Sequence, residues 1–174
     1  MANYRAAFIV ILAVSQMPKT TSQMNPTKIL FVCHGNICRS PMAEYIAKDL
    51  VKKAGIEARF EIASAATSRE EIGNPIYPPA QRVLTQHGIA FGQRAARQIT
   101  PEDYRYYDHI VIMDLNNQRN LQRLLGEDVD HKVTMLMSYA GLQRDVADPW
   151  YTGDFETAFQ DILAGCEELL RSEK

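Results

Sequence analysis

The segment from Cys33 to Ser40 combines residue types that can bind and attack a phosphate group. Five residues separate Cys33 from Arg39, and Ser40 follows directly. If such a segment turns between a strand and a helix, its backbone N–H groups form a concave anion site beside the positive end of the helix. Arg39 adds a planar fork that fits two phosphate oxygens. The pattern predicts a phosphate-binding loop made of Cys33, His34, Gly35, Asn36, Ile37, Cys38, Arg39 and Ser40.

Cys33 is the candidate nucleophile of this loop. The helix terminus and Arg39 favour the thiolate form, and a thiolate that faces a bound phosphoryl group is in position to attack it. The Ser40 hydroxyl can donate a hydrogen bond to the sulfur. Gly35 allows the backbone to approach the anion, and Asn36 tolerates a left-handed conformation. The residues therefore predict a cysteine-dependent phosphatase.

Other uses of these cysteines are weaker. Cys33 and Cys38 could be small buried apolar residues, or two of several metal ligands. A zinc site would need two further ligands, and a loop built around arginine suits an anion better than a cation. We therefore expect no metal and no cofactor. A nucleotide-binding loop is disfavoured because no Gly-Lys-Ser/Thr follows a glycine-rich run.

The elements around the loop alternate between strand and helix. Apolar runs, caps and glycine stops predict strands at 28–32, 60–63, 109–113 and 133–137, with helices at 40–54, 78–87, from Thr100, at 115–125 and at 154–171. Ser40 is the expected N-cap of the first helix and His87 is expected to contact the last carbonyls of its own helix. Such alternation favours an α/β fold: a four-stranded parallel sheet with helices on both faces and the phosphate-binding loop after the first strand. Ligands of such sheets bind beyond the carboxyl ends of the strands, so Ser64 should lie near Cys33.

Composition fits one soluble domain. The chain has 174 residues, 46% of them apolar, and a formal net charge of −2, which gives no reason to expect nucleic acid as a partner. No apolar run approaches the roughly 20 residues that span a membrane, so stable membrane insertion is not expected. Three cysteines are too few for a secreted disulfide framework and favour the cytoplasm.

Residues 1–25 are predicted to be an extension of uncertain role that precedes a catalytic domain at 26–174. Arg5 is followed by the apolar run Ala6 to Val14, which resembles a short signal peptide, so export remains the alternative to a cytoplasmic location. An extra helix or strand packed on the domain is also open.

Several separated motifs resemble the low-molecular-weight protein tyrosine phosphatase family. They lie in that family's order from Lys28 to the C-terminus. The matching segments are Phe31 to Glu44, Ser64 to Ser68, Ile72 to Pro75, Ala96 to Thr100, Met113-Asp114 and Asp148 to Tyr151.

The resemblance implies hydrolysis of phosphotyrosine and small aryl phosphates through a phosphocysteine intermediate, with inorganic phosphate as product and phosphotyrosine-containing proteins as partners. By position, Cys33, Arg39 and Asp148 would be catalytic, with Asp148 as the general acid. Asn36, Ser40 and Ser64 would support the loop. The substrate pocket would include Ile37, Glu70, Trp150 and Tyr151.

Three positions bear on specificity. Relatives that act on phosphoarginine tend to carry threonine at the position of Ile37, so Ile37 favours phosphotyrosine. Glu70 stands where some relatives have an aromatic residue, and the added negative charge favours substrates with basic flanking residues. Arg94 stands where many relatives have a histidine that joins the network supporting the loop, so we expect this network to be rearranged.

Cys38 has two interpretations. It may fill space beside the loop, or, as in relatives, form a reversible disulfide with Cys33 that protects the nucleophile. Two rival functions are arsenate reduction, which would need cysteines that residues 88–106 lack, and phosphoprotein binding without catalysis. Asp114 could brace the sheet, and His109 and His131 are expected to be structural or exposed.

Overall fold

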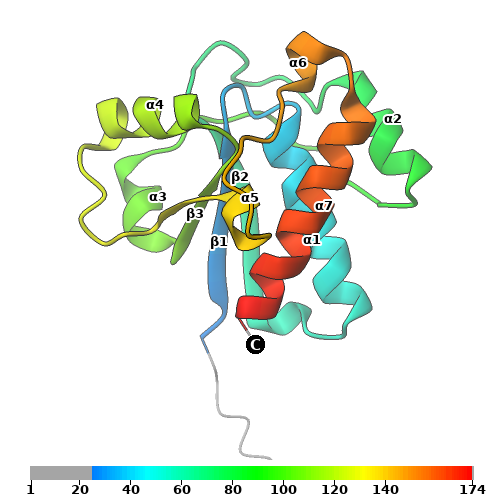
Figure 1. The fold of residues 1–174 in the computed structure, drawn as a ribbon, viewed down its shortest axis with the longest axis horizontal. Coiled ribbons are helices and arrows are strands. Elements are labelled where there is room, and N and C mark those ends of the chain that lie inside the picture. The colour runs from blue at the N-terminus through cyan, green and yellow to red at the C-terminus, as the bar shows by residue number, and fades with distance from the viewer. Residues whose placement is uncertain (1–24, 174) are drawn as a thin grey trace, which may run out of the picture.

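A parallel sheet forms the centre of the molecule (Figure 1). The computed structural model describes residues 25–173. The strand order is β2-β1-β3-β4, and all neighbours are parallel. The strands are β1 (Thr27–Cys33), β2 (Phe60–Ala66), β3 (His109–Ile112) and β4 (Val133–Met135). The predicted four-stranded parallel α/β fold is confirmed.

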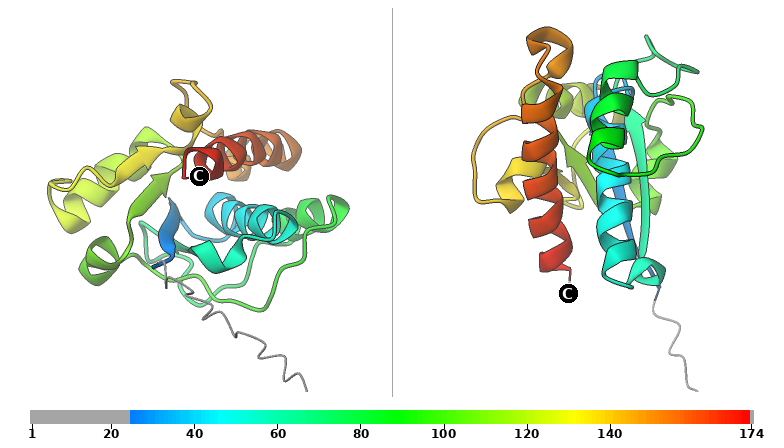
Figure 2. Two further views of the ribbon diagram at one scale, coloured as in Figure 1. Left: turned by 90° about the horizontal axis from the view of Figure 1, so that it is seen from below. Right: turned by 90° about the vertical axis from the view of Figure 1, so that its right-hand side faces the viewer.

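Helices cover both faces of this sheet, as Figure 2 shows end-on and from the side. One face carries α1, α2, α5 and α7, and the other carries α3 and α4. The bounds are α1 (Arg39–Lys53), α2 (Pro78–Gln86), α3 (Pro101–Tyr106), α4 (Leu115–Leu125), α5 (Leu136–Tyr139), α6 (Pro149–Thr152) and α7 (Phe155–Ser172), with a 3-10 turn η1 (Glu57–Arg59).

β1 supplies side chains to two separate apolar clusters. Ile29, Phe31 and Cys33 face the larger cluster under α1 and α7, whereas Leu30 and Val32 face the smaller one under α3 and α4. This alternation follows from the two-residue period of a strand. It explains why a strand buried on both faces reads as an unbroken apolar run, and it directs Cys33 toward the α1 side of the sheet.

Several local predictions were wrong. The second strand continues to Ala66 instead of ending at residue 63. The fourth strand does not reach Met137, because the chain turns into α5 at Leu136. The first helix begins at Arg39, and Ser40 is not its N-cap, since its hydroxyl contacts Cys33. His87 caps its own helix only through its backbone N–H: its ring stacks on Phe159 at 3.9 Å and its Nε2 lies 2.9 Å from a Glu156 carboxylate oxygen.

The predicted role of residues 1–25 lies outside the described residues except for Asn25. Within residues 25–173, no helix has both the length and the apolar character needed to cross a membrane.

Gly165 of α7 is required by a close approach to α5. An added Cβ would lie 2.5 Å from Cγ of the buried Leu136. Replacing glycine by alanine inside a helix normally stabilises by about 0.5–1 kcal/mol. Here the contact leaves no room, and overpacking typically costs about 1–3 kcal/mol. The close packing of α5 against α7 therefore requires glycine at position 165.

We expect Gly165→Ala to lower the free energy of unfolding by about 1 kcal/mol, because the cost of overpacking exceeds the gain in helix propensity. Urea unfolding measures the change. Ala164→Gly, at the exposed neighbouring position, isolates the propensity effect. The double variant Gly165→Ala/Leu136→Ala should lose less stability than the sum of its single changes. A stabilising Gly165→Ala would show that α5 yields without cost.

Candidate active site

The loop after β1 lies where the connections of the sheet diverge. β2 and β3 flank β1 on opposite sides, so the chain leaves the carboxyl end of β1 at a switch point, which is the usual ligand site of an open α/β sheet. Ser64 of β2 pairs with Phe31 of β1, two residues before Cys33. The sheet register therefore brings Ser64 to the loop.

Asn36 is the hydrogen-bonding centre of this loop. Its backbone has a φ of 59°, a left-handed conformation that asparagine tolerates better than most residues. Its buried side-chain amide nitrogen donates to Ser40 Oγ at 2.8 Å and to Ser64 Oγ at 2.9 Å. Both amide protons are thus used on the two serines.

The direction of these bonds fixes the serine protons. Since each hydroxyl oxygen accepts from Asn36, each must donate its own proton elsewhere. Ser64 donates to Glu44 Oε2 at 2.6 Å. Ser40 Oγ lies 3.0 Å from Cys33 Sγ and 3.3 Å from the Ala65 carbonyl oxygen. The shorter contact directs the Ser40 hydroxyl to the sulfur, which also accepts from the Asn36 backbone N–H at 3.3 Å.

Arg94 holds Asn36 from the outside of the loop. One guanidinium nitrogen donates to the Asn36 carbonyl oxygen at 2.8 Å, and the other donates to Asn36 Oδ1, which also accepts from the Arg97 backbone N–H at 3.2 Å. Burial lowers the pKa of Arg94, with Glu44 acting in the opposite direction. Arginine has donors only, so Asn36 must present its oxygen outward and its amide nitrogen to the serines. Arg94 is thus part of the network that supports the loop, and its rearrangement relative to relatives stays a prediction.

Arg39 crosses beneath the pocket and is 2% exposed. One terminal nitrogen donates to Asp114 Oδ2 at 2.7 Å and to the Val146 carbonyl at 2.9 Å, and the other donates to Asp148 Oδ2 at 2.5 Å. Burial opposes the charge, but Cys33 and the carboxylates of Asp148 and Asp114 outweigh it and raise the pKa of Arg39. Asp114 thus has a definite role in anchoring Arg39, which its place after the third strand only suggested.

A pocket opens above the loop and collects most of the predicted residues. Its walls include Glu71, which the sequence argument missed. Trp150 is 51% exposed and Tyr151 83% exposed. Asp148 is held as the N-cap of α6 by accepting from the Trp150 backbone N–H. The lining is Cys33, His34, Gly35, Ile37, Cys38, Arg39, Glu70, Glu71, Asp148, Trp150 and Tyr151.

Two predicted residues form the rim of this pocket. Glu70 lies 3.0 Å from His34 Nε2, and both side chains are well exposed. Tyr77 supports the opposite wall, where its ring centroid lies 5.1 Å from that of Trp150. No motif pointed to Tyr77, because its contact depends on how α2 packs beside α6.

The cysteines have different surroundings. Cys33, Cys38 and Cys166 are all free and buried. Burial, reinforced by the charges of Cys33 and Asp148, raises the pKa of the Cys38 thiol. Burial also raises the pKa of Cys166, which lies within the core.

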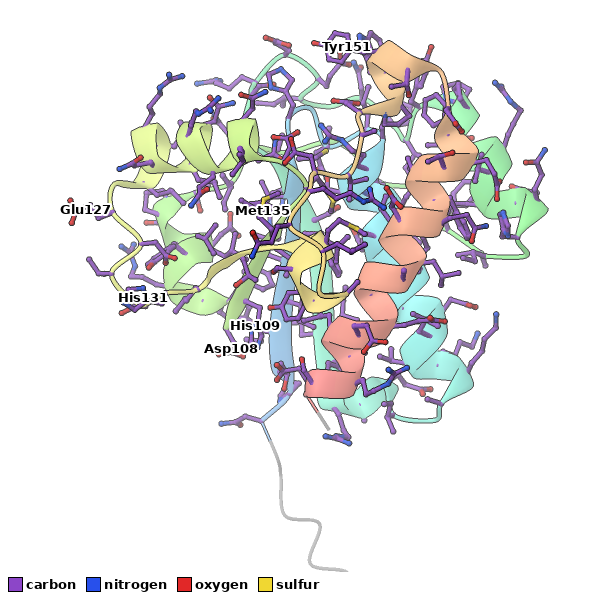
Figure 3. All side chains as sticks on the ribbon, in the orientation of Figure 1. Asp108, His109, Glu127, His131, Met135 and Tyr151 are labelled. Carbon is purple, nitrogen blue, oxygen red and sulfur yellow. The ribbon has the colours of Figure 1, made fainter. Side chains whose placement is uncertain are left out.

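The remaining candidate groups lie away from the pocket. His109 pairs with Glu173 at 3.2 Å. Figure 3 shows His109 and His131 far from Tyr151, which marks the pocket end of the molecule. Among residues 25–173, no group of three or more His, Cys, Asp and Glu side chains is arranged to hold a metal ion.

Comparison with known proteins defines the class. The model of the family described as low molecular weight phosphotyrosine protein phosphatase matches residues 28–174. The low molecular weight protein-tyrosine-phosphatase YfkJ of Bacillus subtilis is 42% identical over 146 residues, which cover 83% of this chain and 94% of YfkJ. The low molecular weight phosphotyrosine protein phosphatase of Homo sapiens is 41% identical, covering 82% and 92% of the two chains.

Solved structures of similar proteins have the same fold as this chain. The crystal structure of YfkJ from Bacillus subtilis superposes with a TM-score of 0.81 at 41% identity and covers 84% of this chain and 94% of its own. The crystal structure of a Drosophila arginine phosphatase gives 0.78 at 33% identity, covering 85% and 98%. The chain belongs to the low molecular weight phosphotyrosine protein phosphatase family, which confirms the resemblance in its sequence. It is a hydrolase of the protein tyrosine phosphatase class, and the reaction of this family passes through a phosphocysteine.

We expect Arg94→Met to slow alkylation of Cys33 by iodoacetamide at neutral pH by about tenfold, the effect of weakening one hydrogen bond to a charged group. Without Arg94 the Asn36 amide can turn its oxygen toward Ser40, and Ser40 then donates to that oxygen instead of to the sulfur. Peptide mapping by mass spectrometry follows Cys33 separately from Cys38 and Cys166.

Alkaline pH provides the internal control, because thiolate formation there no longer depends on the Ser40 hydrogen bond and the two rates should converge. Arg94→Lys keeps a donor-only group, so its rate of Cys33 alkylation should lie between those of wild type and Arg94→Met. If Cys33 of Arg94→Met is alkylated slowly at every pH, the loop has collapsed in this variant. If its alkylation rate at neutral pH equals that of wild type, the role of Arg94 is contradicted.

Proposed function

We propose that the loop after β1 is the catalytic centre of a phosphotyrosine phosphatase, with Cys33 as nucleophile, Arg39 as phosphate ligand and Asp148 as general acid. The observation that carries this assignment is that all three side chains line one pocket while the Ser40 hydroxyl contacts the sulfur. A phosphate-binding module without catalytic activity would need the loop and Arg39. It would not need a hydroxyl group that donates to the Cys33 thiolate, or a carboxylic acid in the same pocket.

The first step transfers the phosphoryl group to sulfur. The Cys33 thiolate forms a bond to phosphorus as the bond to the phenolic oxygen breaks, and Asp148 gives its proton to that oxygen. In the second step water attacks phosphorus, Asp148 takes up a proton, and the sulfur leaves as a thiolate that accepts from Ser40. Inorganic phosphate is the product. A positioned acid of this kind typically contributes about 10²–10⁴ in rate.

The ion pair between Arg39 and Asp148 lies where the substrate phosphate would bind. One Arg39 guanidinium nitrogen is 2.5 Å from Asp148 Oδ2. A phosphate dianion bound in the loop competes for the same guanidinium group and repels the carboxylate. Binding of substrate therefore frees Asp148 from Arg39, so that its carboxyl group can face the phenolic oxygen of the leaving group.

The pocket walls favour an aryl phosphate. Ile37, Trp150 and Tyr151 present apolar and aromatic surface around the loop, and aromatic rings pack well against such walls. This supports phosphotyrosine-containing proteins as partners. The arginine phosphatase relative makes phosphoarginine the competing substrate, and Ile37 argues against it.

A reducing location follows from the cysteine chemistry. The proposed nucleophile is a free thiol and is inactive once oxidised. We therefore propose a cytoplasmic location, with export dependent on residues 1–25. These residues are proposed to lie outside the catalytic domain at 26–174, in keeping with a family match that begins at residue 28.

Hydrolysis of p-nitrophenyl phosphate tests the roles of Cys33 and Asp148. We expect Cys33→Ser to abolish turnover and Asp148→Asn to lower kcat by about 10²–10⁴. With Asp148→Asn the loss should grow as the leaving phenol becomes less acidic, since a poorer leaving group needs its proton more. Asp130→Asn, in the exposed loop before β4, is the matched control and should match wild type. A loss of kcat of the same size for every leaving group would contradict the role of Asp148 as general acid.

Charge at Glu70 sets the second prediction. Phosphotyrosine peptides with basic residues on the flank that passes Glu70 should be cleaved faster at low salt than matched peptides with acidic residues on that flank, because the Glu70 carboxylate is 72% exposed at the rim. An exposed charge pair contributes up to about 1 kcal/mol, or about fivefold. Glu70→Gln should narrow the difference without changing turnover of p-nitrophenyl phosphate. Equal kcat/KM for both peptides in the wild type would contradict the role of Glu70.

Removal of residues 1–25 is expected to preserve kcat for p-nitrophenyl phosphate and the melting temperature, because β1 begins at Thr27. Thermal unfolding and steady-state kinetics of the shortened chain measure both. A large fall in Tm would show that these residues pack on the domain.

A further inference from the structure

A second groove lies beside the active-site pocket, between two helical walls. The α2 wall carries Pro79, Arg82 and Gln86, and the opposite wall carries Trp150, Phe155 and Glu156. The groove has a volume of about 760 Å³. Figures 1 and 2 show α2 lying beside α6 and the first turns of α7. Nothing in the proposed chemistry uses this groove.

The groove and the pocket share Trp150. This residue lines both hollows and is 51% exposed. Its ring lies 5.1 Å from that of Tyr77, which in turn lies 5.9 Å from Phe155. The three rings form an aromatic floor in the groove, and one of them, Trp150, also belongs to the pocket wall.

A phosphotyrosine in a protein must leave the pocket as polypeptide in two directions. One exit passes the rim of His34 and Glu70, and the other passes Trp150 onto the aromatic floor. An apolar side chain placed on this floor would bury aromatic surface that is otherwise exposed to water.

The charges of the groove are unequally engaged. Glu156 contacts His87 Nε2 at 2.9 Å and accepts from Gln160 at 2.8 Å. Asp154 caps α7 by accepting from Thr157 at 2.9 Å. The exposed side chain of Arg82 makes no hydrogen bond or ion pair with any residue of the described chain. It is therefore a cationic group left for a ligand, and its natural partner is a carboxylate.

We propose that this groove binds the substrate polypeptide on the Trp150 side of the phosphotyrosine, with an apolar side chain on the aromatic floor and an acidic side chain against Arg82. The inference rests on the proposed function and adds to it a difference between the two flanks of the phosphotyrosine. Glu70 selects basic residues on one flank, and Arg82 selects acidic residues on the other. Substrates are thus recognised by an uneven distribution of charge around the phosphotyrosine.

Charge reversal at Arg82 tests the groove. Steady-state kcat/KM would be measured at low salt for p-nitrophenyl phosphate and for four phosphotyrosine peptides of one length and composition class, with acidic or neutral residues placed before or after the phosphotyrosine. In wild type, acidic residues on one flank should raise kcat/KM. In Arg82→Glu this preference should be lost, with a fall of about fivefold for that peptide, as for an exposed ion pair.

The controls separate the groove from the chemistry. Arg123→Glu, an equal charge change at the far end of α4, should leave all peptides unchanged. Turnover of p-nitrophenyl phosphate should be the same in every variant, and its absence in wild type would refute the proposed function instead. Equal responses in Arg82→Glu and Arg123→Glu would reduce the effect to overall charge, and no response in Arg82→Glu would remove the groove as a binding site. Either result overturns the inference.

Discussion

The burial of Arg39 governs the arrangement of the active site. A guanidinium group that is 2% exposed cannot release its proton and must be surrounded by acceptors. Asp114 after β3, the Val146 carbonyl and Asp148 before α6 meet this need. Two segments that are remote from Arg39 in sequence are thereby fixed around one cation. The same contacts leave Asp148 at the mouth of the pocket, so the proposed general acid is positioned by the requirement to satisfy a buried charge.

A second network supports the loop independently of Arg39. The side chain of Asn36 is buried, and every one of its polar atoms is engaged by Arg94, Arg97, Ser40 or Ser64. Donor-only groups on one side force a single orientation of the amide, and that orientation determines where the serine protons go. The electrostatic environment of the Cys33 sulfur thus depends on residues that never touch it. A buried network of this kind has its effect only when all its members are present.

The sequence predicted what depends on local chemistry and on strand order. The loop from Cys33 to Ser40, the parallel sheet and the approach of Ser64 all follow from residue types and from the rule that ligands bind beyond the strand ends. It missed features set by packing. Tyr77 supports Trp150 only because α2 lies beside α6, and His87 turns from its own helix to stack on Phe159. The end of β4 at Met135 was misjudged because an apolar run continues unchanged into α5.

The distances along the chain between the partners of Arg39 bear on how the enzyme becomes active. Arg39 and Asp148 are 109 positions apart, and α7, which covers α1, follows later still. Asp114 supplies the first carboxylate 75 positions after Arg39, and Asp148 supplies the second. Contacts of such long range form late, because the entropy of closing the intervening loop must first be overcome. The loop after β1 can therefore form from neighbouring residues, whereas the complete set of partners around Arg39 exists only after the segment before α6 has docked.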